Sequence, residues 1–234
     1  VARGDLGVEM PMEQVPMLQK MMVQKCIQAS KPVIIATQMM ESMITSYTPT
    51  RAEVNDVANA VMDGADAVML SAETSVGKYP VKVIEMMRKI ITEVEKATEI
   101  IYYREHAPSV KTITYVTDSI CFNACQLAHH SGVQAIISMT NSGYTAFKLA
   151  SHRPKANVFI FTDNSSLLTT LSLVWGVQGF YYDKYESTDQ TISDLIQFVK
   201  KRELVKADDL VINIASMPMK EKGRTNMMKL SHVI

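Results

Sequence analysis

Two short runs of apolar and β-branched residues, at positions 31–38 and 65–70, most constrain the fold of this 234-residue chain. Each run predicts a strand buried on both faces, as strands are in parallel sheets. The segment between them opens with a capping-box pattern at Thr50 and Glu53 and continues at helical spacing until Gly64. A strand, a helix and a second strand in this order predict one βαβ unit of an α/β fold.

The rest of the chain continues this alternation. Helices are predicted at residues 11–29 and 80–101, and residues 1–7 suggest the end of a strand that enters a glycine-rich turn. Helical periodicity stops in residues 102–111, which contain Pro108, so we expect a first domain at 1–104 and a second at 105–234. The second opens with a β-branched segment at 112–117. Helices then follow at 118–131, 144–151, 165–174 and 188–202, with strands at 134–139, 157–161, 176–182, 210–215 and 226–234, which predicts an open α/β sheet.

Charge and composition exclude several classes of protein. The chain has 24 Lys and Arg against 24 Asp and Glu, so it has no net field to attract nucleic acid or an anionic membrane. No apolar run approaches the roughly 18 residues that cross a bilayer. Three cysteines predict reduced thiols, and we expect a cytoplasmic protein with no nucleic-acid or membrane partner. Because the sequence starts at Val1 without an initiator Met, we expect it to begin within a longer protein.

Polar residues follow three successive predicted strands. Asp5 lies between Gly4 and Gly7, where a carboxylate and nearby amides suit a hard cation and an anion. Thr37 ends the next strand, and Ser71, Glu73 and Thr74 follow the one after it. Carboxyl ends of parallel strands meet at one edge, where catalytic residues gather in (β/α) sheets. The alternative interpretation is an ordinary Gly-Asp turn with helix caps.

A second candidate site follows the predicted strand at 134–139. Its residues are Thr140, Asn141, Ser142, Gly143 and Thr145, and they open a helix whose amides and hydroxyls suit a phosphate. Plain N-capping by Asn141 or Ser142 explains the same pattern. A charged turn at residues 220–224 either adds cations to this site or is only a solvated turn.

Four segments, 1–9, 31–43, 49–61 and 64–74, closely resemble the pyruvate kinase family, in its bacterial form. The resemblance continues at 77–80, 140–143 and 223–226, so it covers essentially the whole chain. It implies the C-terminal part of a (β/α)₈ TIM barrel followed by an open α/β regulatory domain. Since a whole barrel needs about 250 residues, the chain would supply only the end of the sixth strand and the seventh and eighth strands.

The resemblance also implies a reaction and roles for the site residues. The family transfers phosphoryl from phosphoenolpyruvate to ADP in glycolysis, giving pyruvate and ATP, with Mg²⁺ and K⁺ assisting. Asp5 matches the magnesium ligand, Thr37 matches a hydroxyl beside the enolate, and Ser71 and Glu73 match a network that relays the proton. The substrate-binding positions are Ala2, Arg3, Gly4, Asp5 and Thr37. Ala72 stands where many relatives carry Gly.

The resemblance further implies that parts of the family's site lie outside this chain. The catalytic Lys, the second magnesium carboxylate, the lid domain, the nucleotide-binding arginine and the K⁺ ligands are among them, so we expect the isolated chain to be inactive. Thr140, Asn141, Ser142, Gly143 and Thr145 match the loop that binds a phosphosugar or nucleotide effector, and a homotetramer is implied. Two alternatives stay open: a non-catalytic module that binds a phosphorylated metabolite and mediates assembly, and a magnesium-dependent, aldolase-like barrel.

Overall fold

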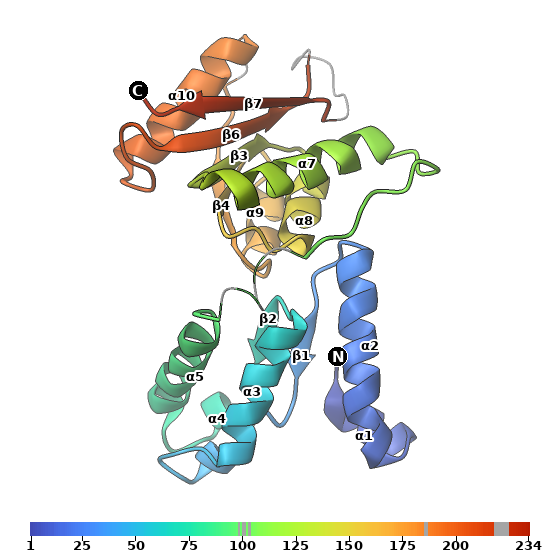
Figure 1. The fold of residues 1–234 in the computed structure, drawn as a ribbon. Helices are drawn as coiled ribbons and strands as arrows, with labels where there is room; N and C mark the ends of the chain where they lie inside the picture. Colours follow the sequence, from blue (N-terminus) through green and yellow to red (C-terminus); the bar gives the residue numbers. More distant parts are fainter. Residues whose placement is uncertain (98, 100–101, 103, 185–186, 218–224) are drawn as a thin grey trace. The chain divides into compact units, whose positions relative to one another are not determined.

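The computed structural model describes residues 1–97, 99, 102, 104–184, 187–217 and 225–234. The chain divides into two compact units, Val1–Ile101 and Tyr102–Ile234 (Figure 1). Within the described residues, no helix has both the length and the apolar character needed to cross a membrane.

The first unit contains a short parallel sheet with helices packed against it. Its elements are α1 (Arg3–Glu9), η1 (Met12–Gln14), α2 (Val15–Gln28), β1 (Ile34–Ala36), η2 (Glu41–Ile44), α3 (Arg51–Asp63), β2 (Ala67–Met69), α4 (Ala72–Ser75) and α5 (Pro80–Val94). β1 pairs in parallel with β2, and Ala2 makes a parallel bridge to Ala36. The chain therefore forms the predicted βαβ unit, with α3 as the crossover helix and the residues before α1 beside β1.

The helix α3 begins and ends as its sequence predicts. The Thr50 hydroxyl accepts a hydrogen bond from the Glu53 amide, and the Glu53 carboxylate accepts one from the Thr50 amide, which confirms the capping box. Gly64 ends the helix with a φ of 102°, a left-handed conformation that glycine adopts without steric cost. The apolar face of α3 joins a core whose buried members are Val23, Ile27, Val33, Ile35, Met39, Met40, Met43, Val57, Ala60, Ala65, Val83, Met87 and Ile90.

Three predictions for this unit need correction. The helix expected at 11–29 divides into η1 and α2, because Pro16 has no N–H to donate and fits only the first turn of α2. The helix expected at 80–101 is described as α5, which ends at Val94, and residues 98, 100 and 101 lie outside the described part. The expected glycine-rich turn is the helix α1, in which neither Gly4 nor Gly7 has a positive φ.

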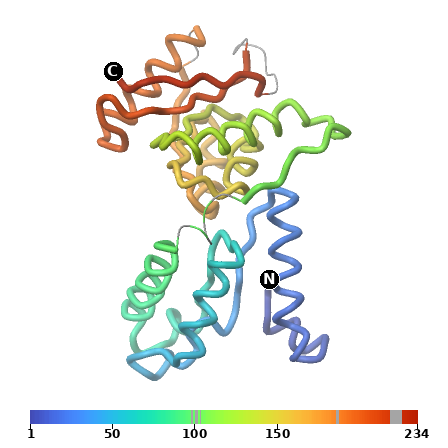
Figure 2. Tube along the Cα trace, viewed as in Figure 1, coloured from blue at the N-terminus to red at the C-terminus, as the bar shows by residue number. Residues whose placement is uncertain are grey.

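The second unit is an open sheet with helices on both faces. Its elements are α7 (Tyr115–Ser131), β3 (Ala135–Met139), α8 (Tyr144–Ser151), β4 (Asn157–Thr162), α9 (Ser165–Leu171), β5 (Val177–Tyr181), α10 (Thr188–Lys201), β6 (Leu210–Ala215) and β7 (Met227–His232). The strand order is β5-β4-β3-β6-β7, and among these described strands only β7 runs antiparallel to its neighbour. Helices α7, α8 and α9 pack on one face of the sheet and α10 packs on the other. Figure 2 shows the path of the chain through these elements.

The predicted elements of this unit match the described ones closely, with one difference at its start. Helix α7 begins at Tyr115, inside the β-branched segment 112–117, rather than at residue 118. Thr117 and Asp118 are buried and extend the stripe formed by Cys121, Ala124, Cys125 and Ala128. The helical spacing of this stripe outweighs the strand propensity of the β-branched residues.

Candidate functional site

The first turn of α1 and the end of β1 meet through a hydroxyl. The Gly4 amide donates a hydrogen bond to Thr37 Oγ1 at 2.9 Å, and this oxygen donates one to the Ala36 carbonyl at 2.6 Å. Amides in the first turn of a helix have no partner within the helix, so the Thr37 side chain caps α1 from another segment. The structure thus brings together two of the predicted site residues, Gly4 and Thr37.

The backbone at Thr37 is in an uncommon conformation. Thr37 has a φ of 70° and Gln38 a φ of 54°, so two successive residues with side chains lie in the left-handed region. This region costs an L-residue roughly 1–2 kcal/mol, and such conformations persist where surrounding contacts hold them. Here the contacts come from Arg3, whose Nε and Nη2 both donate to the Thr37 carbonyl, at 3.2 and 2.6 Å.

The Arg3 guanidinium makes hydrogen bonds and an ion pair with other residues of the first unit. Its Nη2 also donates to the Gln38 carbonyl, and its Nη1 lies 2.6 Å from Asp56 Oδ1 on α3. At this predicted substrate-binding position, the side chain is thus occupied by contacts within the first unit. Asp56 lies in the segment 49–61 that resembles the family, but the sequence did not predict its contact, because no local pattern links residues that are 53 positions apart.

A buried carboxylate connects the ends of β1 and β2. Glu73 is 3% exposed, and its two oxygens accept hydrogen bonds from the amides of Met40, at 3.2 Å, and Ser71, at 2.7 Å. The contact with Ser71 uses its amide rather than its hydroxyl. Glu73 therefore fixes the loop that follows Thr37 against the beginning of α4.

Asp5 offers an exposed carboxylate in the first turn of α1. No group of three or more His, Cys, Asp or Glu side chains in the described ranges is arranged to hold a metal ion. Magnesium in enzymes is often held by one or two carboxylates together with water and substrate oxygens. Asp5 thus fits one ligand position of such a site, and the remaining ligands must come from the substrate, water or other protein segments.

The second candidate site lies where β3 leads into α8. Gly143 has a φ of 83°, a conformation that favours glycine, and a Cβ there would lie 2.6 Å from Leu167 Cδ1, so the Leu167 side chain would have to shift. The Thr140 hydroxyl accepts from the Gly143 amide at 3.1 Å, and the Ser142 hydroxyl accepts from the Tyr144 amide at 3.4 Å. Asn141 and Ser142 are exposed beside the beginning of α8.

Thr145 differs from the exposed residues of this loop. It is 4% exposed, and its hydroxyl lies 3.0 Å from the Thr225 hydroxyl, so it connects α8 to the residues before β7. Close by, the Tyr144 hydroxyl donates to Asp118 at 2.6 Å; burial, followed by this hydrogen bond, raises the pKa of Tyr144. The charged turn predicted at 220–224 lies outside the described residues.

Comparisons with known proteins identify relatives for both units. The model of the pyruvate kinase barrel domain matches residues 1–84, and that of the pyruvate kinase alpha/beta domain matches residues 118–231. Similar curated proteins include pyruvate kinases from Geobacillus stearothermophilus, 43% identical, and Clostridium acetobutylicum, 41% identical, each aligned with 100% of this chain. A solved pyruvate kinase from Cryptosporidium parvum is 33% identical, with a TM-score of 0.85 over 100% of the chain.

The match extends over only part of each relative. The chain spans 40% of the Geobacillus protein, 49% of the Clostridium protein and 46% of the solved Cryptosporidium chain. The predicted fold class, a C-terminal barrel portion followed by an α/β domain, is confirmed by the order of the two matched domains.

Proposed function

Because the chain belongs to the pyruvate kinase family, we propose that it is the C-terminal portion of an enzyme that transfers phosphoryl from phosphoenolpyruvate to ADP, giving pyruvate and ATP. The observation that carries this proposal is the contact between Gly4 and Thr37 at the strand edge, 2.9 Å long. It joins two distant segments that both resemble the family's site. A lone glycine-rich turn or a lone strand-end threonine would not carry the same weight.

In this proposal the beginning of α1 receives the substrate carboxylate. The beginning of α1 carries the partial positive charge of a helix N-terminus, which favours an anion, although the Gly4 amide there already donates to Thr37 Oγ1. Asp5 would hold Mg²⁺, and the bound ion would supply positive charge for an anionic substrate. The Thr37 hydroxyl borders the reacting carbon, where it binds substrate and orients the proton that the enolate receives.

Ser71 and Glu73 support the same edge from β2. The two amide hydrogen bonds to Glu73 keep the loop after Thr37 in place, which supports a role in the hydrogen-bond network near the proton. The family resemblance implies that the remaining groups of the reaction, including the Lys, the nucleotide-binding arginine and the K⁺ ligands, belong to segments outside these 234 residues. The isolated chain is therefore inactive in this proposal, and the whole enzyme acts as a cytoplasmic homotetramer, as the family resemblance implies.

A test of this function uses a hybrid enzyme, in which this chain replaces the aligned segment of the Geobacillus stearothermophilus relative. Asp5→Asn in the hybrid removes the charge of one metal ligand, so the Mg²⁺ concentration at half-maximal rate should rise about tenfold or more. Glu9→Gln is the matched control, because Glu9 is an exposed carboxylate on the same helix. An unchanged Mg²⁺ dependence in the Asp5 variant would remove Asp5 from the metal site.

The second candidate function is binding of a phosphorylated effector by the α/β unit. The observation that favours it is the exposure of Asn141 and Ser142 beside α8, in a loop whose shape Gly143 fixes. A phosphosugar or nucleotide monophosphate that binds only the folded form would raise the melting temperature of the chain. Ser142→Asp would abolish that rise by repelling the phosphate, whereas Ser172→Asp, on the exposed end of α9, would leave it intact. Absence of any rise with wild-type protein would leave the loop as a helix cap.

A further inference from the structure

We propose that Asp56 is a positioning residue that fixes the strained backbone of Thr37 through the guanidinium of Arg3. Thr37 and Gln38 hold left-handed φ angles that residues with a Cβ seldom adopt, so some contact must hold them. Two donors from Arg3 converge on the Thr37 carbonyl, and one of them also reaches the Gln38 carbonyl. The guanidinium therefore binds the carbonyl groups of both residues that have a left-handed φ.

Asp56 determines where that guanidinium lies. Its Oδ1 accepts from Arg3 Nη1 at 2.6 Å, and the Arg3 side chain is 12% exposed while that of Asp56 is 31% exposed. An ion pair shielded from water in this way is screened less than a surface pair, and its planar donor set fixes orientation as well as distance. Since α3 is itself anchored at both ends, by the Thr50 cap and by Gly64, Asp56 provides a rigid support.

The position of the Arg3 guanidinium also affects the Thr37 hydroxyl. The Thr37 backbone directs Oγ1 toward the Gly4 amide, so the cap on α1 depends on the left-handed conformation. Without Asp56, Arg3 would have other rotamers available, and the Thr37 peptide would lose the donors that offset its strain. The inference rests on the proposed function only where it states what Thr37 does for the substrate. The contacts that join Asp56, Arg3 and Thr37 lie within this chain and do not depend on the proposed function.

The first experiment measures the geometry in the 234-residue chain by NMR. Two variants, Asp56→Asn and Asp56→Ala, are compared with Asp63→Asn, a change at the end of the same helix that breaks the ion pair with Lys20. We expect the Gly4 amide to exchange about tenfold or more faster in the Asp56 variants, the factor that corresponds to a lost charge-assisted hydrogen bond. The ¹³C shifts of Thr37 should move away from their left-handed values. Asp63→Asn should change neither signal.

Unchanged Gly4 exchange and unchanged Thr37 shifts in Asp56→Asn would overturn the proposal. If Asp56→Ala does not fold, the isosteric Asp56→Asn variant still decides it. A general loss of stability would accelerate the amides of α2 as much as that of Gly4, and that result would also count against a positioning role.

The second experiment separates this proposal from the proposed function. In the hybrid enzyme, Asp56→Asn should lower kcat about tenfold and leave KM for ADP unchanged, because Asp56 acts on Thr37 and not on the nucleotide. A hybrid that folds but is inactive with the wild-type chain would contradict the proposed function, and the NMR result would then still support or overturn the role of Asp56. An active hybrid in which Asp56→Asn leaves kcat unchanged would overturn the catalytic consequence.

Discussion

Glu53 combines a helix cap with a loop anchor in one side chain. Its carboxylate accepts hydrogen bonds from the amide and hydroxyl of Thr50 and from the amide and hydroxyl of Ser42, at 2.5–2.8 Å. Burial raises the pKa of Glu53, but these bonds from Ser42 and Thr50 outweigh it and leave the pKa below its usual value. The charged carboxylate therefore stabilises the folded state.

The pH dependence of this contribution follows from its sign. A carboxylate whose pKa is lowered by folding stabilises the protein fully above its unfolded pKa, and the effect is lost as the pH falls through the lower, folded value. Glu53→Gln should therefore reduce the free energy of unfolding at pH 7, and the difference from wild type should shrink on acidification below about pH 4.5. Urea unfolding at several pH values measures this. Glu93→Gln, on an exposed pair, is the control, and an equal loss at every pH would contradict the account.

Single residues also show how far the sequence predicts the site. The strand-end position of Thr37, Ser71 and Glu73 follows from the apolar runs that precede them, and the structure has them there. The prediction that both runs are buried on both faces was wrong for β2, whose Ala67 and Val68 are half-buried and whose Met69 is exposed. The role of Asp56 could not be predicted, because an ion pair between residues far apart leaves no periodic pattern. The left-handed φ of Thr37 was equally hidden, since threonine carries no sequence signal for that region.

At the scale of the element, the beginning of α8 depends on a glycine for two separate reasons. Gly143 and Gly132 both have positive φ, 83° and 65°, but an added Cβ would strike Leu167 only at Gly143 and would meet nothing within 4 Å at Gly132. Gly132→Ala should cost roughly 1–2 kcal/mol from backbone strain alone. Gly143→Ala should cost about 1–3 kcal/mol more, because Leu167 or the loop must move. Chemical denaturation of both variants measures this, and equal losses would show that the Leu167 contact does not restrict the loop.

The elements that differ from their prediction do so for a common reason. Helix α7 begins early because the buried side chains of Thr117 and Asp118 extend its core-facing stripe, and sequence patterns treat such residues as polar. Helix α1 forms over Gly4 and Gly7 because Thr37 satisfies an amide of its first turn. In both cases a tertiary contact outweighs local propensity, and such contacts cannot be seen in a window of neighbouring residues.

For the whole molecule, the two units contain sheets of different completeness. Over the described part of the chain, the first unit has a two-stranded sheet of three-residue strands, whereas the second has five strands with helices on both faces.

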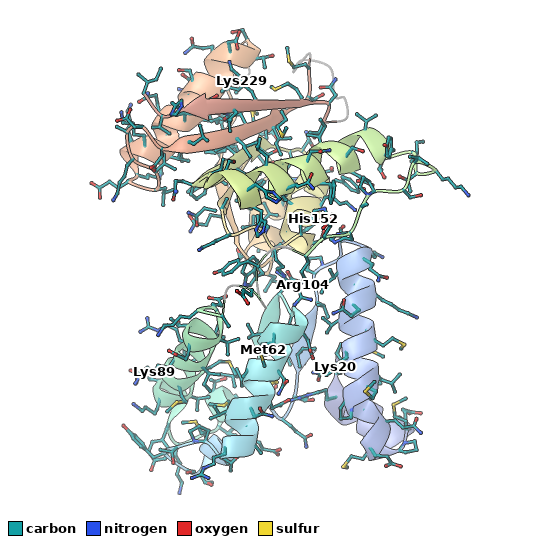
Figure 3. The ribbon with its side chains drawn as sticks, viewed as in Figure 1. Lys20, Met62, Lys89, Arg104, His152 and Lys229 are labelled. Atoms are coloured by element: carbon teal, nitrogen blue, oxygen red, sulfur yellow. The ribbon has the colours of Figure 1, made fainter. Side chains whose placement is uncertain are left out.

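The second unit also buries a histidine. Figure 3 labels His152, together with Arg104 and with Lys229 on the edge strand β7. His152 is 0% exposed, and burial, followed by the neighbouring His106, lowers its pKa to about 3, so it stays neutral within this unit.

Hydrogen exchange should reflect this difference between the units. Amides of β3, β4 and β6 have strands on both sides, so they should exchange more slowly than those of β1 and β2 in the chain studied alone. Exchange followed by mass spectrometry resolves the two regions. Equal protection of both sheets would mean that the two-stranded sheet of the first unit is as stable as the five-stranded sheet of the second.

The central claim is that this chain supplies one edge of a pyruvate kinase site. The most direct measurement is phosphoenolpyruvate-dependent ATP formation by the hybrid enzyme, by its Thr37→Val variant and by the isolated chain. We predict turnover in the ordinary enzyme range of about 1–10³ s⁻¹ for the hybrid, a loss of about 10²-fold or more for Thr37→Val, and no turnover for the isolated chain. A folded hybrid that binds phosphoenolpyruvate without forming ATP, or a Thr37→Val hybrid as fast as its parent, would contradict the account.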